Sequence, residues 1–268
     1  MKRKRMKTGG VTALACCAMA ASHTDAALSA YDGFTTTGDL TGQTGGSGFT
    51  GAWGSSDQSL TVVSGTLSYS TLVTTGGKVE ANSTDELEFR GLPSTSTGTV
   101  WMSALMQVNG TSNITSNMAS IGLFTGTTSQ RTWLAVRQGQ VQFYTRNAAD
   151  TAWDINNSTS YTNGDTVFLV SRIQYGAGTG GSDLVDYWVN PALGASLTSG
   201  DITVDNSGVA FDSIRISGSG GTGGTNTPNY IDEIRFGNSY AEVAPVPEPS
   251  SAALLGLAGL ALILRRRK

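Results

Sequence analysis

Apolar and polar residues alternate over short runs along the middle of the chain. The clearest example is Arg131–Arg146, where Leu134 and Val136 on one side of Gly139 are matched by Val141 and Phe143 on the other. Alternation with a period of two, interrupted by a short glycine turn, predicts an antiparallel hairpin. Two further stretches, 100–108 and 167–173, are apolar at nearly every position. Such runs are typical of strands that are covered on both faces.

Similar runs recur along residues 29–244, separated by Gly, Asn, Ser and Thr, and no sustained helical period interrupts them. Three glycine-rich segments, 41–51, 176–182 and 218–227, are predicted loops. We therefore predict an all-β fold over residues 28–244, a jelly-roll sandwich of two antiparallel sheets. The predicted strands are 29–34, 60–64, 66–70, 78–81, 87–90, 98–109, 118–124, 131–138, 140–146, 166–174, 184–190, 208–217, 230–237 and 240–244.

The first 27 residues have a different pattern from the body. A cationic run, Lys2–Lys7, precedes a stretch of small apolar residues, Thr8–Ala21, and then a zone of small residues. This order is typical of a secretory signal peptide with a short helix. It predicts export through the Sec machinery and removal of residues 1–27.

The other end combines three features in a fixed order. The triplet Pro247-Glu248-Pro249 cannot continue a helix or strand, and an apolar run of 13 residues, Ala252–Leu264, follows it. As a helix this run would span roughly 20 Å, against a hydrocarbon core of about 30 Å. The terminal cations Arg265, Arg266, Arg267 and Lys268 extend its reach and favour the cytoplasmic side. The pattern predicts a short transmembrane helix in the inner membrane.

Residues 245–268 closely resemble the PEP-CTERM sorting signal of Gram-negative bacteria. The resemblance implies that Pro247, Glu248 and Pro249 are recognised by an exosortase-type membrane enzyme, with cleavage and transfer to the cell surface or extracellular polysaccharide. In that case the triplet is a substrate motif and not a catalytic site. A plain tail anchor is the alternative, and it leaves the triplet without a role.

Charge and composition narrow the function of the body. Nine of the 17 basic residues lie in the two terminal segments, so residues 27–246 hold eight basic and 18 acidic residues, a net charge of −10. Such a body is a poor partner for nucleic acid. The single histidine, His23, and the cysteines Cys16 and Cys17 lie in the predicted signal peptide. A mature chain without them lacks the residues for Ser-His-Asp catalysis, thiolate zinc sites and disulfides.

The body also resembles the concanavalin A-like and laminin-G-like sandwiches, a fold that hosts lectins, hydrolases and inert spacers. The segments that carry this resemblance are Ala30-Tyr31-Asp32-Gly33-Phe34, Gly48-Phe49-Thr50-Gly51-Ala52-Trp53, Tyr187-Trp188-Val189-Asn190-Pro191-Ala192-Leu193-Gly194 and Tyr230-Ile231-Asp232-Glu233-Ile234-Arg235-Phe236-Gly237.

One pair of carboxylates could support chemistry. Glu86 and Glu88 alternate with Leu87 and Phe89, so the two carboxyls share a strand face roughly 6.6 Å apart. Glycoside hydrolysis needs two carboxyls at about that spacing. The concanavalin-like family-16 glucanases use a strand motif of Glu, any residue, Asp, two residues and Glu. Here Glu88 would replace the Asp, and the third position is Gly91, which has no carboxyl. The hydrolase therefore stays an alternative to a solvated acidic face beside Arg90.

Asp232 is a candidate ligand contact. Asp232 shares its strand parity with Tyr230, Ile234 and Phe236, so its carboxylate needs a partner on an apolar face. Loop backbone N–H groups or an arginine such as Arg215 could supply that partner, and a bound Ca²⁺ is the alternative, although the chain has no sequential calcium loop.

The five tryptophans include candidate platforms for sugar rings. Trp153 lies in the polar segment Ala152–Asn157, which is interpreted as a loop, whereas Trp101, Trp133 and Trp188 are expected in the core. We predict an exported, non-catalytic surface or matrix protein with weak carbohydrate-binding or adhesive function, with Trp153 as the glycan contact. No catalytic site, metal site or cofactor is predicted. The alternative is a secreted glycoside hydrolase using Glu86 and Glu88.

Overall fold

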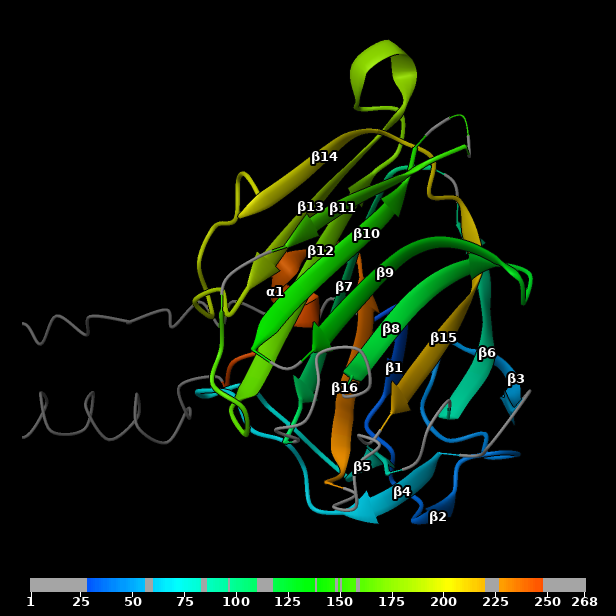
Figure 1. Ribbon diagram of the computed structural model, residues 1–268, viewed down its shortest axis with the longest axis vertical. Coiled ribbons are helices and arrows are strands. Elements are labelled where there is room, and N and C mark those ends of the chain that lie inside the picture. The colour runs from blue at the N-terminus through cyan, green and yellow to red at the C-terminus, as the bar shows by residue number, and fades with distance from the viewer. Residues whose placement is uncertain are drawn as a thin grey trace, which may run out of the picture.

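In the described part of the chain, sixteen strands form two antiparallel sheets that pack face to face (Figure 1). The computed structural model describes residues 28–55, 60–82, 86–95, 97–109, 118–137, 139–147, 149, 151–157, 160–219 and 227–247, without the side chains of residues 95, 153–157 and 206. Within these ranges no helix is long and apolar enough to cross a membrane. The predicted signal peptide and the predicted membrane helix at 252–264 lie outside the described residues.

The nine-stranded sheet, called sheet A, runs in the order β14-β13-β12-β7-β16-β5-β4-β2, and β1 pairs with β16 beside this path. Its strands are β1 (Ala30–Asp32), β2 (Gly38–Asp39), β4 (Thr61–Ser64), β5 (Gly77–Ala81), β7 (Thr99–Gln107), β12 (Thr166–Gln174), β13 (Asp183–Val189), β14 (Ile202–Ser207) and β16 (Asn229–Gly237).

The seven-stranded sheet, called sheet B, runs in the order β11-β10-β9-β8-β15-β6-β3 and lies in front in Figure 1. Its strands are β3 (Thr50–Ser55), β6 (Glu86–Thr95), β8 (Met118–Thr125), β9 (Ser129–Arg137), β10 (Gln140–Arg146), β11 (Trp153–Asn157) and β15 (Phe211–Ser219). A 3-10 turn, η1 (Thr179–Gly181), and a short helix, α1 (Tyr240–Val243), complete the described elements. The predicted sandwich and the predicted hairpin of β9 and β10 are confirmed.

The apolar runs in β7 and β12 serve two separate cores. On β7, Met102, Ala104 and Met106 face sheet B, whereas Trp101 and Leu105 face away from it. The first set belongs to the core between the sheets, and the second belongs to a further core on the outer face of sheet A. Because both faces are covered, both parities must be apolar, as the sequence pattern predicts.

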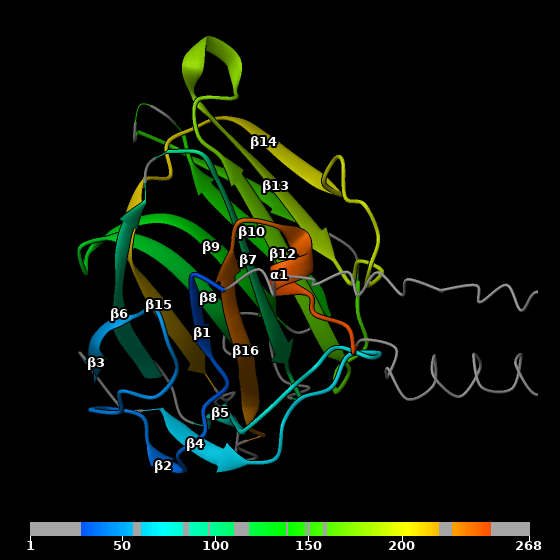
Figure 2. The ribbon, with the colours of Figure 1, turned by 180° about the vertical axis from the view of Figure 1, so that it is seen from behind.

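The outer core of sheet A lies beneath residues 65–76 and α1 (Figure 2). Leu67 and Leu72 enter it from the segment 65–76, and Tyr240 and Val243 enter it from α1. Hydrogen bonds hold the cover in place: Ser103 Oγ donates to the Val243 carbonyl at 2.7 Å, and Val73 N donates to the Pro245 carbonyl at 3.2 Å. The outer core is the buried cluster Leu67, Leu72, Trp101, Leu105, Phe168, Val170, Trp188, Tyr240, Val243 and Ala244.

Two predicted strands are wrong because their residues belong to this cover. Residues 66–70 form no strand, since the N–H of Leu67 donates to a side-chain carboxylate of β16 and not to a neighbouring strand. Residues 240–243 form α1, which begins after Ser239, whose Oγ accepts the N–H of Glu242 at 3.4 Å. The apolar side chains of both segments pack one by one against the outer face of sheet A.

Four strands that the sequence pattern does not predict are β2, β3, β11 and β14. Residues 41–51 are interpreted as a loop, yet β3 begins at Thr50, and the segment around Trp153 is interpreted as a loop, yet it forms β11. All four strands lie at the ends of the two sheets. Edge strands bury less side-chain surface than central strands, so their apolar alternation is weak.

Candidate functional site

The face of β6 that carries Glu86 and Glu88 points into the protein, so the predicted solvated acidic face is wrong. Both residues are buried, and so is Arg90, while Leu87 and Phe89 on the other face are half-buried. Glu88 Oε1 accepts a hydrogen bond from Thr41 Oγ1 at 2.6 Å, and Glu86 Oε2 accepts the N–H of Asn82 at 2.9 Å. The two carboxylates share a face as predicted, but they serve the packing of nearby segments.

Arg90 pairs with Asp32 in the interior. Arg90 Nη1 lies 2.7 Å from Asp32 Oδ2, which also accepts the indole N–H of Trp53 at 3.0 Å. The other carboxylate oxygen accepts the N–H of Phe34, and the guanidinium also donates to the Gly45 carbonyl at 2.6 Å. Burial lowers the pKa of Arg90, and the nearby Asp32 opposes that shift. This network joins β1, β3 and β6 and is structural.

Asp232 shares a face with Tyr230, as the sequence predicts, but lies on the opposite face from Ile234 and Phe236. A bulge in β16 between Asp232 and Arg235 shifts the register against β7, with Glu233 at a φ of 54°. Ile234 and Phe236 therefore enter the core between the sheets, whereas Asp232 faces the cover of sheet A. Simple alternation fails at an inserted residue, and nothing in the sequence marks this one.

Backbone N–H groups supply the partners of Asp232, as one of the two alternatives anticipated. Asp232 Oδ2 accepts the N–H of Leu67 at 2.8 Å, and Oδ1 accepts the N–H of Glu233 at 2.7 Å. Burial raises the pKa of Asp232 to about 8, against the effect of the Leu67 N–H. Beside it, Arg235 forms an ion pair with Glu233. Among the described residues, no group of three or more His, Cys, Asp or Glu could hold a metal ion.

The tryptophans divide between core and surface differently from the prediction. Trp53, Trp101 and Trp188 are buried, but Trp133 is half-buried on the outer face of sheet B. The expectation of a core position for Trp133 is therefore wrong. Trp153 begins the edge strand β11, where its backbone pairs with that of Arg146, and its side chain lies outside the described residues.

One row of side chains crosses the outer face of sheet B at a single register position. Tyr144 on β10 pairs with Trp133 on β9, Trp133 with Gly122 on β8, Gly122 with Arg215 on β15, and Arg215 with Phe89 on β6. We call these five residues the cross-strand row. Phe89 in turn pairs with β3, so the row and its extension cross six strands, roughly 24 Å at the usual strand spacing. Its four side chains are half-buried.

The aromatic rings of the row lie against one another and against arginines. The rings of Trp133 and Tyr144 have centroids 5.2 Å apart, and the Tyr144 hydroxyl donates to Gln142 Oε1 at 2.8 Å. The Arg137 guanidinium lies 5.5 Å from the centre of the Trp133 ring. The row therefore offers flat apolar surface with hydrogen-bonding groups at its edges.

Gly122 gives the middle of the row its shape. A Cβ at this position would lie 2.8 Å from Cε2 of Phe124, so the ring of Phe124 occupies the space that a side chain would need. Phe124 is buried beneath Arg215, whose guanidinium lies 4.4 Å from its ring centre. The side chains of Trp133 and Arg215 therefore project on either side of Gly122, which has no side chain.

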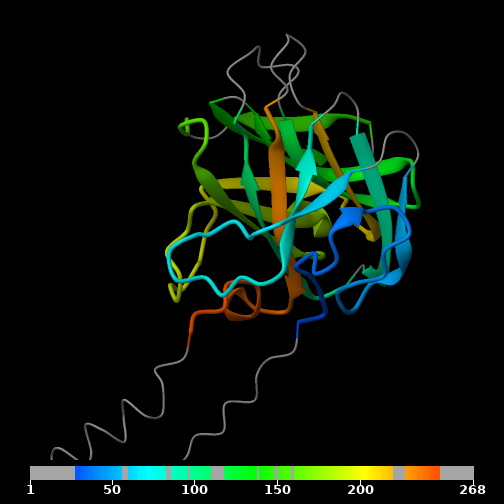
Figure 3. The ribbon, with the colours of Figure 1, turned by 90° about the horizontal axis from the view of Figure 1, so that it is seen from below.

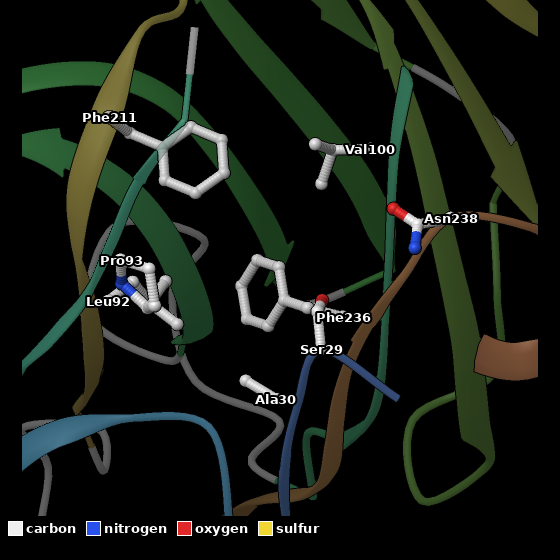
Figure 4. Close-up of a pocket in the computed structure, with 8 residues that line it drawn as sticks. All are labelled: Ser29, Ala30, Leu92, Pro93, Val100, Phe211, Phe236 and Asn238. Atoms are coloured by element: carbon white, nitrogen blue, oxygen red, sulfur yellow. The ribbon is translucent and has the colours of Figure 1, made fainter. Parts of the chain in front are cut away.

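Two hollows of the surface bear on ligand binding. One, of about 380 Å³, extends the row beyond Phe89 and is lined by Gly54, Ser55, Thr127 and Thr128. The other, of about 170 Å³, lies at one end of the sandwich. Figure 4 shows the rings of Phe211 and Phe236 across this second space, whose lining also includes Ser29, Ala30, Leu92, Pro93, Val100 and Asn238. Its walls are mostly apolar.

Comparison with known proteins identifies one segment of the chain. Residues 245–268 match the PEP-CTERM protein-sorting motif, which confirms the predicted sorting signal and implies export and processing by an exosortase-type enzyme. No curated protein matches the chain in sequence.

Several solved structures resemble the body. The globular domain of T. cruzi calreticulin aligns with a TM-score of 0.46 and 9% identity over 80% of this chain and 94% of that chain. The ligand-binding domain of botulinum neurotoxin serotype D, in complex with N-acetylneuraminic acid, aligns with a TM-score of 0.43 and 14% identity over 75% of this chain and 47% of that chain. The receptor-binding domain of the botulinum neurotoxin C/D mosaic serotype aligns with a TM-score of 0.45 and 12% identity, over 75% and 47%. The chain spans about half the length of these toxin domains.

Proposed function

We propose that this protein is an exported cell-surface or extracellular-matrix protein of a Gram-negative bacterium that binds polysaccharide through the cross-strand row. The observation that carries the proposal is the line of half-buried side chains, Tyr144, Trp133, Arg215 and Phe89, at one register position of sheet B. Sugar rings present flat C–H surfaces that stack on aromatic faces, while their hydroxyls bond to polar groups at the edges. A row that crosses five strands suits a chain of sugars better than a single ring.

The position of the sorting motif supports display of this face. In the view from below, α1 and the two ends of the described chain lie on one side of the body, and β8, β9 and β10 lie on the other (Figure 3). The described chain is held to the body as far as Pro245, directly before Pro247 and Glu248. While the C-terminal helix holds the protein in the inner membrane, the row would face away from the membrane, toward extracellular polysaccharide.

The proposal includes no catalysis by Glu86 and Glu88. Both side chains are buried on the inner face of β6, whereas the row lies on its outer face. A hydrolase would need the two carboxyls to reach a glycosidic bond, and their hydrogen bonds to Asn82 and Thr41 hold them in the interior. Unchanged release of reducing sugar from β-glucans by Glu86→Gln and Glu88→Gln variants supports this part, and loss of a measured activity in both variants contradicts it.

Affinity electrophoresis in gels that contain extracellular polysaccharide tests the binding proposal. We expect Trp133→Ala with Tyr144→Ala to abolish most of the retardation seen with the unaltered chain, because the variant loses both stacking surfaces. Tyr230→Ala is the matched control, since Tyr230 is a half-buried aromatic on the other side of the molecule, beneath Lys78. Trp153→Ala tests the remaining tryptophan candidate at the edge of the same sheet. Equal retardation of the double variant and the unaltered chain would rule out the row as the binding surface.

A further inference from the structure

We propose that the polysaccharide bound by the cross-strand row is acidic, with carboxylate or sulfate groups that Arg137 and Arg215 bind. This inference rests on the proposed function and specifies its ligand. Both guanidinium groups lie on the outer face of sheet B, one over Trp133 and the other over Phe124. Arg215 pairs with Gly122 at the centre of the row, and Arg137 lies on β9 opposite Met118, four residues along the strand from Trp133.

Three other arginines of the body form ion pairs with carboxylates of the chain. Arg90 pairs with Asp32, Arg172 with Asp186 and Arg235 with Glu233. In each case a carboxylate of the chain compensates the buried charge, as partly buried charges require. The body has more than twice as many acidic as basic residues, so carboxylates are abundant.

Arg137 and Arg215 differ from those three. Among the described residues, neither forms an ion pair with a carboxylate, and Arg137 Nε is buried with no hydrogen-bond partner there. Burial lowers the pKa of Arg215, with no carboxylate effect to oppose it. The nearby acid on β15, Asp212, accepts the N–H of Gly126 at 2.6 Å. Two partly desolvated guanidinium groups on aromatic rings are therefore prepared for an anion that the described residues do not supply.

The planar guanidinium matches the chemistry of an acidic sugar. Its N–H groups bind both oxygens of a carboxylate or sulfate in parallel, and its face can remain stacked on a ring while they do so. Arg131 and Arg146 occupy the same outer face of β9 and β10, which places four of the eight basic residues of the body on the outer face of sheet B. At physiological salt the Debye length is about 8 Å, so these nearby charges outweigh the distant acidic surface at contact.

Matched polymers separate this inference from the proposed function. Polygalacturonate and its fully methyl-esterified form share one backbone and differ in charge, and dextran sulfate and dextran do the same for sulfate. We expect the full secreted chain to bind at least one acidic polymer about tenfold more tightly than its neutral partner, because charge-assisted hydrogen bonds are lost on neutralisation. The pair of polymers that shows this difference in affinity identifies the anionic group as carboxylate or sulfate.

Substitutions test the two arginines. Arg137→Gln with Arg215→Gln should reduce affinity for the acidic polymer about tenfold and leave affinity for the neutral partner unchanged. Lys78→Gln is the control, because it removes a cation from sheet A, where Lys78 lies over Tyr230. In addition, the affinity of the unaltered chain should fall between 50 and 200 mM salt, a readout that needs no variant.

Three results would overturn the inference. Equal binding to an acidic polymer and its neutral partner, without salt dependence, would show that the ligand is neutral while the proposed function stands. An equal loss of affinity in Lys78→Gln would show that overall charge, and not this face, controls binding. Absence of binding to all four polymers and to extracellular polysaccharide would overturn the proposed function as well.

Discussion

The outer faces of the two sheets carry the same kinds of side chain and use them in opposite ways. On sheet A, Trp101 and Trp188 stack with centroids 5.3 Å apart, and residues 65–76 and α1 cover the face that carries them. On sheet B, the ring centroids of Trp133 and Tyr144 lie 5.2 Å apart, and both side chains are half-buried. The first pair contributes to a second core, whereas the second pair remains available to a ligand.

The arginines repeat this contrast. Arg235 lies beneath the cover of sheet A, where it pairs with Glu233 and donates to the Val73 carbonyl. Arg137 and Arg215 lie on rings of sheet B, with no carboxylate partner among the described residues. The composition of a face therefore does not decide its role. What decides it is whether another segment of the same chain covers the face.

Matched tryptophan substitutions should give the largest difference between the faces. Trp101→Ala removes a buried ring from the outer core and should lower the free energy of unfolding by about 3–5 kcal/mol. Trp133→Ala removes a half-buried ring and should cost about 1 kcal/mol. Chemical denaturation of both variants measures the difference. Equal losses would mean that the outer face of sheet B is as structural as that of sheet A.

Matched arginine substitutions should repeat the contrast with charged groups. Arg235→Met leaves Glu233 buried without its ion-pair partner and should destabilise the fold by about 3 kcal/mol. Arg215→Met keeps the apolar contact with Phe124 and removes a charge that no described carboxylate balances, so stability should change by less than about 0.5 kcal/mol. Urea unfolding at one pH compares the two. A large loss in Arg215→Met alone would reverse the assigned roles.

The covered face should also make stability depend on pH. The pKa of Asp232 is about 8 in the folded protein because of burial, against about 3.9 in an unfolded chain. Between these values the folded state holds a proton that the unfolded state has lost, so stability should fall as pH rises from about 4 to 8, by at most about 1.4 kcal/mol per unit.

The charged groups next to Asp232 also affect how stability depends on pH. Glu233 and Arg235 lie beside it, and burial also raises the pKa of Glu233, although Arg235 opposes that shift. Melting temperatures from pH 4 to pH 9 should therefore decline for the unaltered chain and decline less for Asp232→Asn. Parallel curves for the two proteins would show that Asp232 does not hold this proton.

The sequence predicts the central strands and the sandwich because these strands bury regular apolar patterns. It does not predict β2, β3, β11 and β14, which lie at sheet edges and carry weak patterns. The prediction that Asp232 shares a face with Ile234 and Phe236 is wrong because the bulge in β16 inserts a residue. The prediction of a core position for Trp133 is wrong, because alternation tells which residues share a face but not which face another segment covers. The cross-strand row depends on pairing between distant strands, which no local pattern reveals.

Hydrogen–deuterium exchange with and without an acidic polysaccharide reports on the outer faces of both sheets in one experiment. We expect polygalacturonate or dextran sulfate to slow exchange in β8, β9, β10 and β15 and to leave exchange in residues 65–76 and α1 unchanged. Protection confined to residues 65–76 and α1, with no change in sheet B, would contradict it.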